Sequence, residues 1–240
     1  MKLNAPIDRP RISSHFQYSV WKYLLLIVAA IFVWDLIYAY TAYRSPQDKR
    51  IDIYTQHAVA SQEYLNAYFD ELRKESVPDM EVVNAVTLMG TSAADMYAAQ
   101  QLTTYIMAGE GDLYFLSGDD FKRFAAQGAF VELEPYAADG TLVLDGLMLD
   151  AGKVAMQEYD SDKEVMVPIA QQRLYGIPAS QLPGFPAILG IDNRDLFLAA
   201  TTFSGNEENV MRFLNALIQQ MRADSLSDSE SPLFAEETRP

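Results

Sequence analysis

An apolar segment near the N-terminus constrains this chain more than any other feature. The 21 residues between Lys22 and Arg44 contain a single charged residue, Asp35. At a rise of about 1.5 Å per residue, a helix of this length crosses the roughly 30 Å hydrocarbon core of a bilayer. Aromatic residues lie at both ends, as they do at the two membrane interfaces: Trp21, Tyr23, Tyr38, Tyr40 and Tyr43. The segment predicts a transmembrane helix at residues 23–43.

The alternative interpretation of this segment is a cleaved signal peptide. Its apolar region would be residues 23–34, and cleavage would follow Ala39 or Ala42. The bulky Ile37 or Tyr40 would then lie three residues before the cut, where signal peptidases prefer small residues. The charged leader is also long for a signal peptide. We therefore expect an uncleaved anchor.

The distribution of charge indicates how the chain is oriented. Residues 1–50 carry seven basic and three acidic residues, a net charge of +4. Residues 51–240 carry 11 basic and 30 acidic residues, a net charge of −19. Such a split indicates two different environments. We expect a single-pass protein of the cell membrane, with residues 1–22 in the cytoplasm and the main domain outside the cell.

Asp35 is unusual because an ionised carboxylate at mid-membrane costs about 2.5–3.5 kcal/mol on insertion scales. One interpretation is that Asp35 pairs with a polar group on another membrane helix, which makes it a contact with a membrane partner. The other is that the helix shifts so that Asp35 reaches the outer headgroups, or that the carboxyl is protonated. Both interpretations stay open at the level of the sequence.

Composition excludes several classes of function. The sequence pI near 4.4 argues against a nucleic-acid-binding protein, which needs a basic face. The chain has no cysteine, so disulfides, thiolate zinc sites, iron–sulfur clusters and a cysteine nucleophile are excluded. His57 has no partner in a catalytic arrangement, and the acidic run 160–164 lacks the glycine and distant glutamate of a calcium loop. We expect no enzyme activity, no metal and no cofactor.

The rest of the chain alternates between strand and helix patterns, which predicts an α/β fold with a parallel sheet and right-handed crossovers. Strands are expected at 51–56, 81–88, 112–116, 164–169, 174–178, 187–191 and 196–203, with a further extended segment at 130–133. Helices are expected at 61–75, about 92–108 and 207–222, with a short helix around Phe121, Phe124 and Ala125 that Gly128 ends. In the second of these helices, Met96, Leu102, Tyr105 and Ile106 are expected to point inward. Residues 136–163 show no clear periodicity, and the acidic tail 224–240 is expected to be disordered.

The sequence contains an ordered series of motifs: a Gly109-Glu110-Gly111-Asp112 turn before a strand, the run Gln127–Leu133, the strand Leu174-Tyr175-Gly176-Ile177-Pro178 and the late helix Asn206–Ile218. In these motifs, and in the segment 104–136 in particular, the chain resembles the extracellular solute-binding proteins of ABC importers. The similarity covers residues 51–135 well and 165–220 more loosely. Members of that family close two lobes around a ligand, and the residues here suffice for one. The resemblance thus implies one three-layer, periplasmic-binding-protein-like lobe with a mainly parallel sheet at residues 51–223, anchored by the membrane helix in place of the family's lipid-bearing cysteine.

A ligand site in such a fold lies outside the carboxyl ends of the parallel strands. Polar residues follow the first three strands of the predicted sheet at these ends: Gln56, His57, Thr91, Ser92, Ser117 and Asp119. The backbone amides at 91–93 could receive an anion at the start of a helix. The alternative is that these residues serve only as helix caps and turn residues.

The resemblance implies a non-catalytic, membrane-anchored subunit that acts as an accessory component of a membrane transport complex. The expected partner is a membrane protein, for which the resemblance indicates an ABC permease, and a small solute is a further expected ligand. One alternative is an assembly or sensory protein that binds no solute. Another is a weak receptor for a small ligand.

Overall fold

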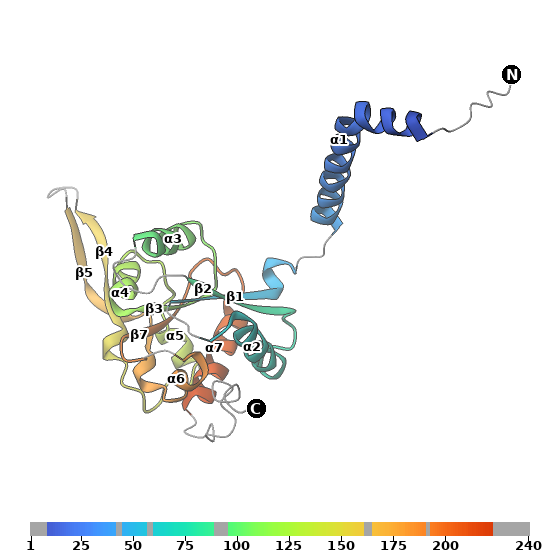
Figure 1. Ribbon diagram of the computed structural model, residues 1–240. Coiled ribbons are helices and arrows are strands. Elements are labelled where there is room, and N and C mark those ends of the chain that lie inside the picture. Colours follow the sequence, from blue (N-terminus) through green and yellow to red (C-terminus); the bar gives the residue numbers. More distant parts are fainter. Residues whose placement is uncertain are drawn as a thin grey trace. The chain divides into compact units, whose positions relative to one another are not determined.

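The chain divides into two compact units, Met1–Arg44 and Ser45–Pro240. The computed structural model describes residues 9–41, 45–56, 60–88, 96–160, 165–190 and 193–222. The first unit contains the helix α1, Arg9–Thr41 (Figure 1). Its part Val20–Thr41 has a mean hydropathy of 2.1, none of it is buried, and it is long enough to cross a membrane. The predicted apolar helix is confirmed, and its place in a membrane stays a prediction.

The second unit is built on a five-stranded sheet with the order β2-β1-β3-β7-β6. The strands are β1 Arg50–Gln56, β2 Val82–Leu88, β3 Leu113–Ser117, β6 Ile177–Pro178 and β7 Leu196–Ala200. Strands β2, β1 and β3 are parallel, with Ile53 opposite Ala85 on one side and Leu113 on the other. Strands β7 and β6 join antiparallel. The α/β class and the parallel-rich sheet are confirmed, although the sheet is mixed.

Side chains alternate between the two faces of this sheet, as the period of a strand requires. On β1, Ile51 and Ile53 join one buried cluster, whereas Tyr54 joins the other. On β3, Phe115 belongs to the first cluster and Tyr114 to the second. Both faces of the sheet are therefore buried, as in the predicted three-layer arrangement.

The helices are distributed over these two faces (Figure 1). The first face is covered by α2 Gln62–Ser76, α6 Gly184–Leu189 and α7 Glu207–Arg222, whose apolar residues belong to the first cluster. The second is covered by α3 Met96–Met107 and α4 Gly118–Ala126. The short helices are α5 Glu134–Ala138 and the 3-10 turns Gln47–Lys49, Asp150–Gly152 and Ala179–Gln181. We refer to the side of α2, α6 and α7 as the closed face, and to the side of α3 and α4 as the open face.

Strands β4 Lys153–Asp160 and β5 Val165–Leu174 form a separate antiparallel hairpin beside α4 (Figure 1). Two glycines fix its base to the lobe. A Cβ on Gly152 would collide with the carbonyl oxygen of Gly176, and a Cβ on Gly176 would collide with the ring of Phe121. Only glycine fits at these positions because backbone and ring approach so closely there.

The predicted strand 187–191 is wrong, because residues 184–189 form the helix α6. A short apolar run does not distinguish a buried strand from a buried helix. Here Pro183 precedes the helix, and Gly190, with φ of 67°, ends it in the left-handed conformation. Ile191 lies outside the described residues.

Three other expectations differ from the structure. Segment 130–133 holds a single bridge, Phe130 to Thr201, in place of a strand. Strand β4 lies within the region 136–163, which showed no periodicity. Strand β5 continues to Leu174, beyond the predicted end at 169. The hairpin has little apolar pattern because much of it is exposed on both sides.

Candidate functional site

A hydrogen-bonded network occupies the carboxyl ends of β1 and β3. The buried side chain of Gln56 joins the two ends: its Nε2 donates to Asp120 Oδ2 at 2.8 Å, and its Oε1 accepts from the backbone N–H of Ser117 at 2.7 Å. Parallel pairing of β1 with β3 brings Gln56 and Ser117 together although they are 61 positions apart in the sequence.

The same network caps helix α4. Ser117 is the N-cap, and its Oγ accepts from the backbone N–H of Asp120 at 3.4 Å. Arg123 donates to the other carboxylate oxygen of Asp120 at 2.8 Å. The network residues Gln56, Ser117, Asp120 and Arg123 therefore satisfy one another. The Ser117 hydroxyl also donates to Asp120 Oδ2 at 3.2 Å. This arrangement positions the first turn of α4.

The structure brings together two of the predicted site residues, Gln56 and Ser117. Asp119 is exposed on the first turn of α4. His57, Thr91 and Ser92 lie outside the described residues, so their roles, including the anion site, stay predictions. Asp35 lies in α1, and its contact with a membrane partner also stays a prediction.

Sequence reasoning missed Asp120 and Arg123. A signal for both was present, because Ser117 and Asp120 have the three-residue spacing of a capping box. Arg123 follows Asp120 by three residues, which places the two side chains on the same side of a helix.

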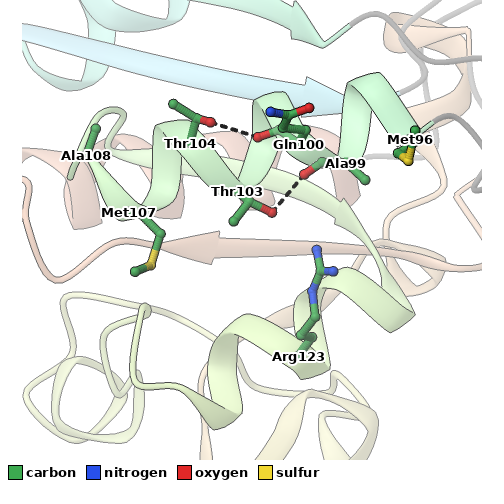
Figure 2. Close-up of a pocket in the computed structure, with 8 residues that line it drawn as sticks. All are labelled: Met96, Ala99, Gln100, Thr103, Thr104, Met107, Ala108 and Arg123. Carbon is green, nitrogen blue, oxygen red and sulfur yellow. Dashed lines mark hydrogen bonds between the residues drawn. The ribbon is translucent and has the colours of Figure 1, made fainter.

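A groove on the open face is lined by α3 along its length and by Arg123 of α4 (Figure 2). Its volume is about 680 Å³. The lining residues are Met96, Ala99, Gln100, Thr103, Thr104, Met107 and Ala108 from α3, with Arg123 from α4. We refer to this feature as the α3 groove. The α3 groove is distinct from the network at the carboxyl ends of β1 and β3, although Arg123 takes part in both.

The α3 groove is largely apolar. Met96 and Met107 mark its two ends and are 83% and 75% exposed. The prediction that Met96 points inward is therefore wrong, whereas Leu102 and Ile106 are buried as expected. The two threonine hydroxyls are used within the helix: Thr103 donates to Ala99 O at 2.7 Å and Thr104 to Gln100 O at 2.9 Å (Figure 2).

Arg123 supplies the cationic group of the groove. Its guanidinium lies 4.4 Å from the centre of the Phe124 ring, a favourable cation–π arrangement. The ion pair with Asp120 holds it in place, and the Arg123 side chain remains 46% exposed. The α3 groove thus combines exposed apolar side chains with one oriented cation.

A buried acid, Asp112, lies at the amino end of β3, away from the carboxyl ends of the parallel strands. Its Oδ2 accepts from the backbone N–H of Asp52 at 2.7 Å. Burial raises the pKa of the Asp112 carboxyl, and the hydrogen bonds from Asp52 and Ser204 partly counter that shift. Burial also raises the pKa values of Tyr54 and Tyr114, whose rings stack with their centroids 5.1 Å apart.

Among the described residues, no three acidic or histidine side chains come together as a metal site.

Comparison with known proteins gives matches only among solved structures. No protein-family profile and no curated protein matches the sequence. One match is the extracellular solute-binding protein family 1 from Alicyclobacillus acidocaldarius, 13% identical with a TM-score of 0.37, covering 54% of this chain and 27% of that one. An ABC substrate-binding protein from Listeria monocytogenes, in complex with cycloalternan, is 24% identical with a TM-score of 0.33, covering 53% and 28%.

A third match is the N-glycan transport solute-binding protein from Streptococcus pneumoniae, in complex with Man5GlcNAc. It is 16% identical with a TM-score of 0.37, and the match covers 54% of this chain and 24% of that one. Two designed esterases are matched as well. The aligned part amounts to about a quarter of each solute-binding protein. Solute-binding proteins of ABC importers are also the class that the sequence motifs resemble.

Proposed function

We propose that this chain is a membrane-anchored, non-catalytic subunit of a transport complex, whose α/β lobe binds a protein partner through the α3 groove. The observation that carries the proposal is the α3 groove, whose lining is mainly apolar and which has an exposed methionine at each end, Met96 and Met107, on a lobe that follows an apolar helix. Exposed apolar side chains gathered in one groove are typical of interaction sites. The network at Gln56 and Ser117 is engaged in capping α4, which supports a structural role for these residues.

The partner that fits the α3 groove presents apolar side chains between the two methionines and a carboxylate opposite Arg123. Methionine side chains are flexible and polarizable, so they adapt to an incoming apolar surface. A second subunit of the same membrane complex, such as a permease, meets the anchored lobe at high local concentration, so modest contacts suffice.

Co-purification from the native membrane tests this proposal. We expect Met107→Glu to reduce recovery of a transporter subunit by about tenfold, equivalent to about 1.4 kcal/mol, because it places a charge in the apolar groove. The matched control is Met148→Glu, which adds the same charge at a methionine of similar exposure outside the groove. Equal recovery with both variants, or recovery of no transporter subunit with the unmodified chain, would contradict the proposal.

The proposed topology places residues 1–22 in the cytoplasm and the lobe outside, with α1 uncleaved. Since the chain has no cysteine, a single introduced cysteine is the one site that a maleimide can label, and labelling shows on which side of the membrane that residue lies. In intact cells we expect a membrane-impermeant maleimide to label Asp119→Cys, and to label Asn4→Cys only after permeabilisation. The reverse pattern would overturn the topology, and a mature chain that lacks position 4 would indicate cleavage.

We further propose that Asp35 pairs with a polar group of a partner helix. The cost of an uncompensated carboxyl in the membrane supports this pairing. Asp35→Leu should lower recovery of the membrane partner, whereas Asp35→Asn, which keeps hydrogen-bonding capacity, should retain more of it. Unchanged recovery of the membrane partner with Asp35→Leu would contradict the proposed pairing.

A small-ligand receptor is the second candidate, because polar Gln56 and Ser117 lie at the sheet edge where α/β folds bind ligands. A thermal-shift screen of the full chain against sugars, peptides and anions separates the candidates. A shift that Gln56→Met abolishes would favour the receptor. Absence of any shift, together with recovery of no transporter subunit, would favour an assembly or sensory protein.

A further inference from the structure

The loop between α5 and the hairpin contains both Asp–Gly pairs of the chain, Asp139-Gly140 and Asp145-Gly146. We propose that Asp145 is a modification site, at which the protein converts an aspartate into an isoaspartate without a cofactor or a second enzyme. The surroundings of Asp145 favour this reaction, whereas those of Asp139 oppose it. The proposal depends neither on the α3 groove nor on the membrane anchor.

The reaction rearranges the link between Asp145 and Gly146. The Gly146 nitrogen attacks the carbon of the protonated Asp145 carboxyl, so that an N–C bond forms and a C–O bond breaks. The hydroxyl leaves as water with the proton from the nitrogen, and the product is a cyclic imide. Water then adds to the main-chain carbonyl of the imide and breaks its C–N bond. Gly146 is thereafter attached through the former side-chain carboxyl, and no atom is gained or lost overall.

Glycine makes the attacking nitrogen accessible. Asp145 and Gly146 are exposed turn residues, and the turn is closed by the Leu147 N–H, which donates to Leu144 O at 3.2 Å. Gly146 has a φ of 79°, in the left-handed region that glycine adopts without steric cost. It carries no side chain, and among the described residues its N–H has no hydrogen-bond acceptor. The nitrogen is therefore accessible to the neighbouring carboxyl.

Arg222 activates the same nitrogen. Its side chain extends from the last residue of α7, and its Nη2 donates to the backbone oxygen of Asp145 at 2.6 Å. A cation at this oxygen stabilises the negative charge that the peptide group acquires as its N–H gives up the proton. The same Nη2 lies 3.5 Å from the position that a Cβ on Gly146 would occupy. Arg222 thus lowers the barrier to attack by the Gly146 nitrogen.

The two aspartates differ in how their carboxyl groups are held. Asp139 Oδ1 accepts from the backbone N–H of Thr141 at 2.8 Å, and hydrogen bonds from Thr141 keep the pKa of Asp139 below its ordinary value. Asp139 is thereby fixed as a carboxylate, which is a poor target for a nucleophile. In the part of the chain that the structure describes, the Asp145 carboxyl takes part in no hydrogen bond or ion pair. It is free to rotate toward Gly146.

The modification should loosen the loop. An isoaspartate places the Cβ in the main chain, so the turn from Leu144 to Leu147 becomes longer. Leu144 is buried in the large cluster of the closed face, Leu147 packs against that cluster, and Arg222 ties the turn to α7. Because a longer turn cannot keep all three contacts, we expect the modified lobe to unfold at a lower urea concentration.

The test is to age the full chain in neutral-lipid nanodiscs and to locate isoaspartate by mass spectrometry with electron-transfer fragmentation. We expect isoaspartate to accumulate about tenfold faster at Asp145 than at Asp139, a difference of about 1.4 kcal/mol in the barrier. Arg222→Gln should slow accumulation at Asp145 severalfold. Arg212→Gln removes the same charge from an exposed position on α7, and as the matched control it should leave the rate unchanged.

Equal accumulation at the two aspartates, an equal effect of Arg222→Gln and Arg212→Gln, or no isoaspartate at Asp145 would each overturn the proposal. The first comparison is made within the unmodified chain, so it requires no variant to fold. Asp145→Ser lacks the reacting carboxyl and should keep its urea midpoint during ageing, whereas that of the unmodified chain falls. An equal decline in both chains would contradict the effect assigned to the loop.

Discussion

The closed and open faces of the sheet are both covered by helices, but the helices are held very differently. On the closed face, α7 buries seven side chains against the sheet and α2. On the open face, α3 buries only Leu102 and Ile106 and leaves both terminal methionines in solvent. Because apolar burial is the main source of stability, the closed face should hold the lobe together. The open face retains surface for another molecule.

The largest expected effect of a single substitution is on the closed face. Phe213→Ala removes a fully buried ring from α7 and should lower the free energy of unfolding by about 3–5 kcal/mol. Urea denaturation of the full chain, followed by fluorescence, measures this loss. A loss below 1 kcal/mol would mean that α7 does not anchor the lobe.

Leu102→Ala is the corresponding substitution on the open face. We expect a loss of about 2–3 kcal/mol, at the lower end for a buried leucine, since α3 can move toward the space that is left. Measured in the same way, a loss equal to that of Phe213→Ala would show that the two faces are held equally firmly.

Gln56→Met tests the hydrogen-bonded network at the carboxyl ends of β1 and β3, between the two faces of the sheet. The variant keeps the apolar volume but leaves the Ser117 N–H without its acceptor, which should cost about 1–3 kcal/mol. Asp119→Asn on the same helix turn is the control and should change stability by less than about 0.5 kcal/mol. Similar unfolding midpoints for the two variants would mean that the network contributes nothing to the lobe.

Asp112 is buried immediately before β3, where it contacts the backbone of β1. Its pKa in the folded state is raised above the ordinary value of 3.8, so the folded state holds the proton more tightly than the unfolded state. Stability from this group is present at low pH and is lost as pH rises through the folded pKa. Asp112→Asn should remove that decline in urea midpoints across the acidic range, and an unchanged pH profile would contradict the assignment.

The smallest expected effect on stability is at the α3 groove. Met107→Ser should alter the free energy of unfolding by less than about 0.5 kcal/mol, because the side chain is already exposed. Partner recovery should nevertheless fall. A loss of stability as large as that of Leu102→Ala would assign Met107 to the core and remove the contrast between the two faces.

Among the parallel strands, β1 was predictable because its first residues alternate, with Ile51 and Ile53 on one face, and β3 because it is a short, nearly continuous apolar run. The helix α6 was not, since its short apolar run reads equally well as a strand. The hairpin was missed because its exposed strands carry little apolar pattern. At the site, spacing alone could have paired Ser117 with Asp120. It could not have revealed that Met96 is exposed, because a methionine at helical spacing looks the same whether a neighbour covers it or not.

The close approach of Gly152 and Gly176 has a consequence for how this lobe can be altered. The chain leaves the lobe at Gly152 and returns at Tyr175, whose N–H donates to Gly152 O at 3.1 Å. Further out, Ala155 and Gln172 are still paired side by side. We therefore expect that a tight turn in place of residues 156–171 removes the packing of Met156 on the open face but leaves the register of the five-stranded sheet unchanged, and that a folded module can be inserted at the same pair. The hairpin is thus a position in the fold where we expect insertions and deletions to change the length of the chain without changing the five strands of the sheet.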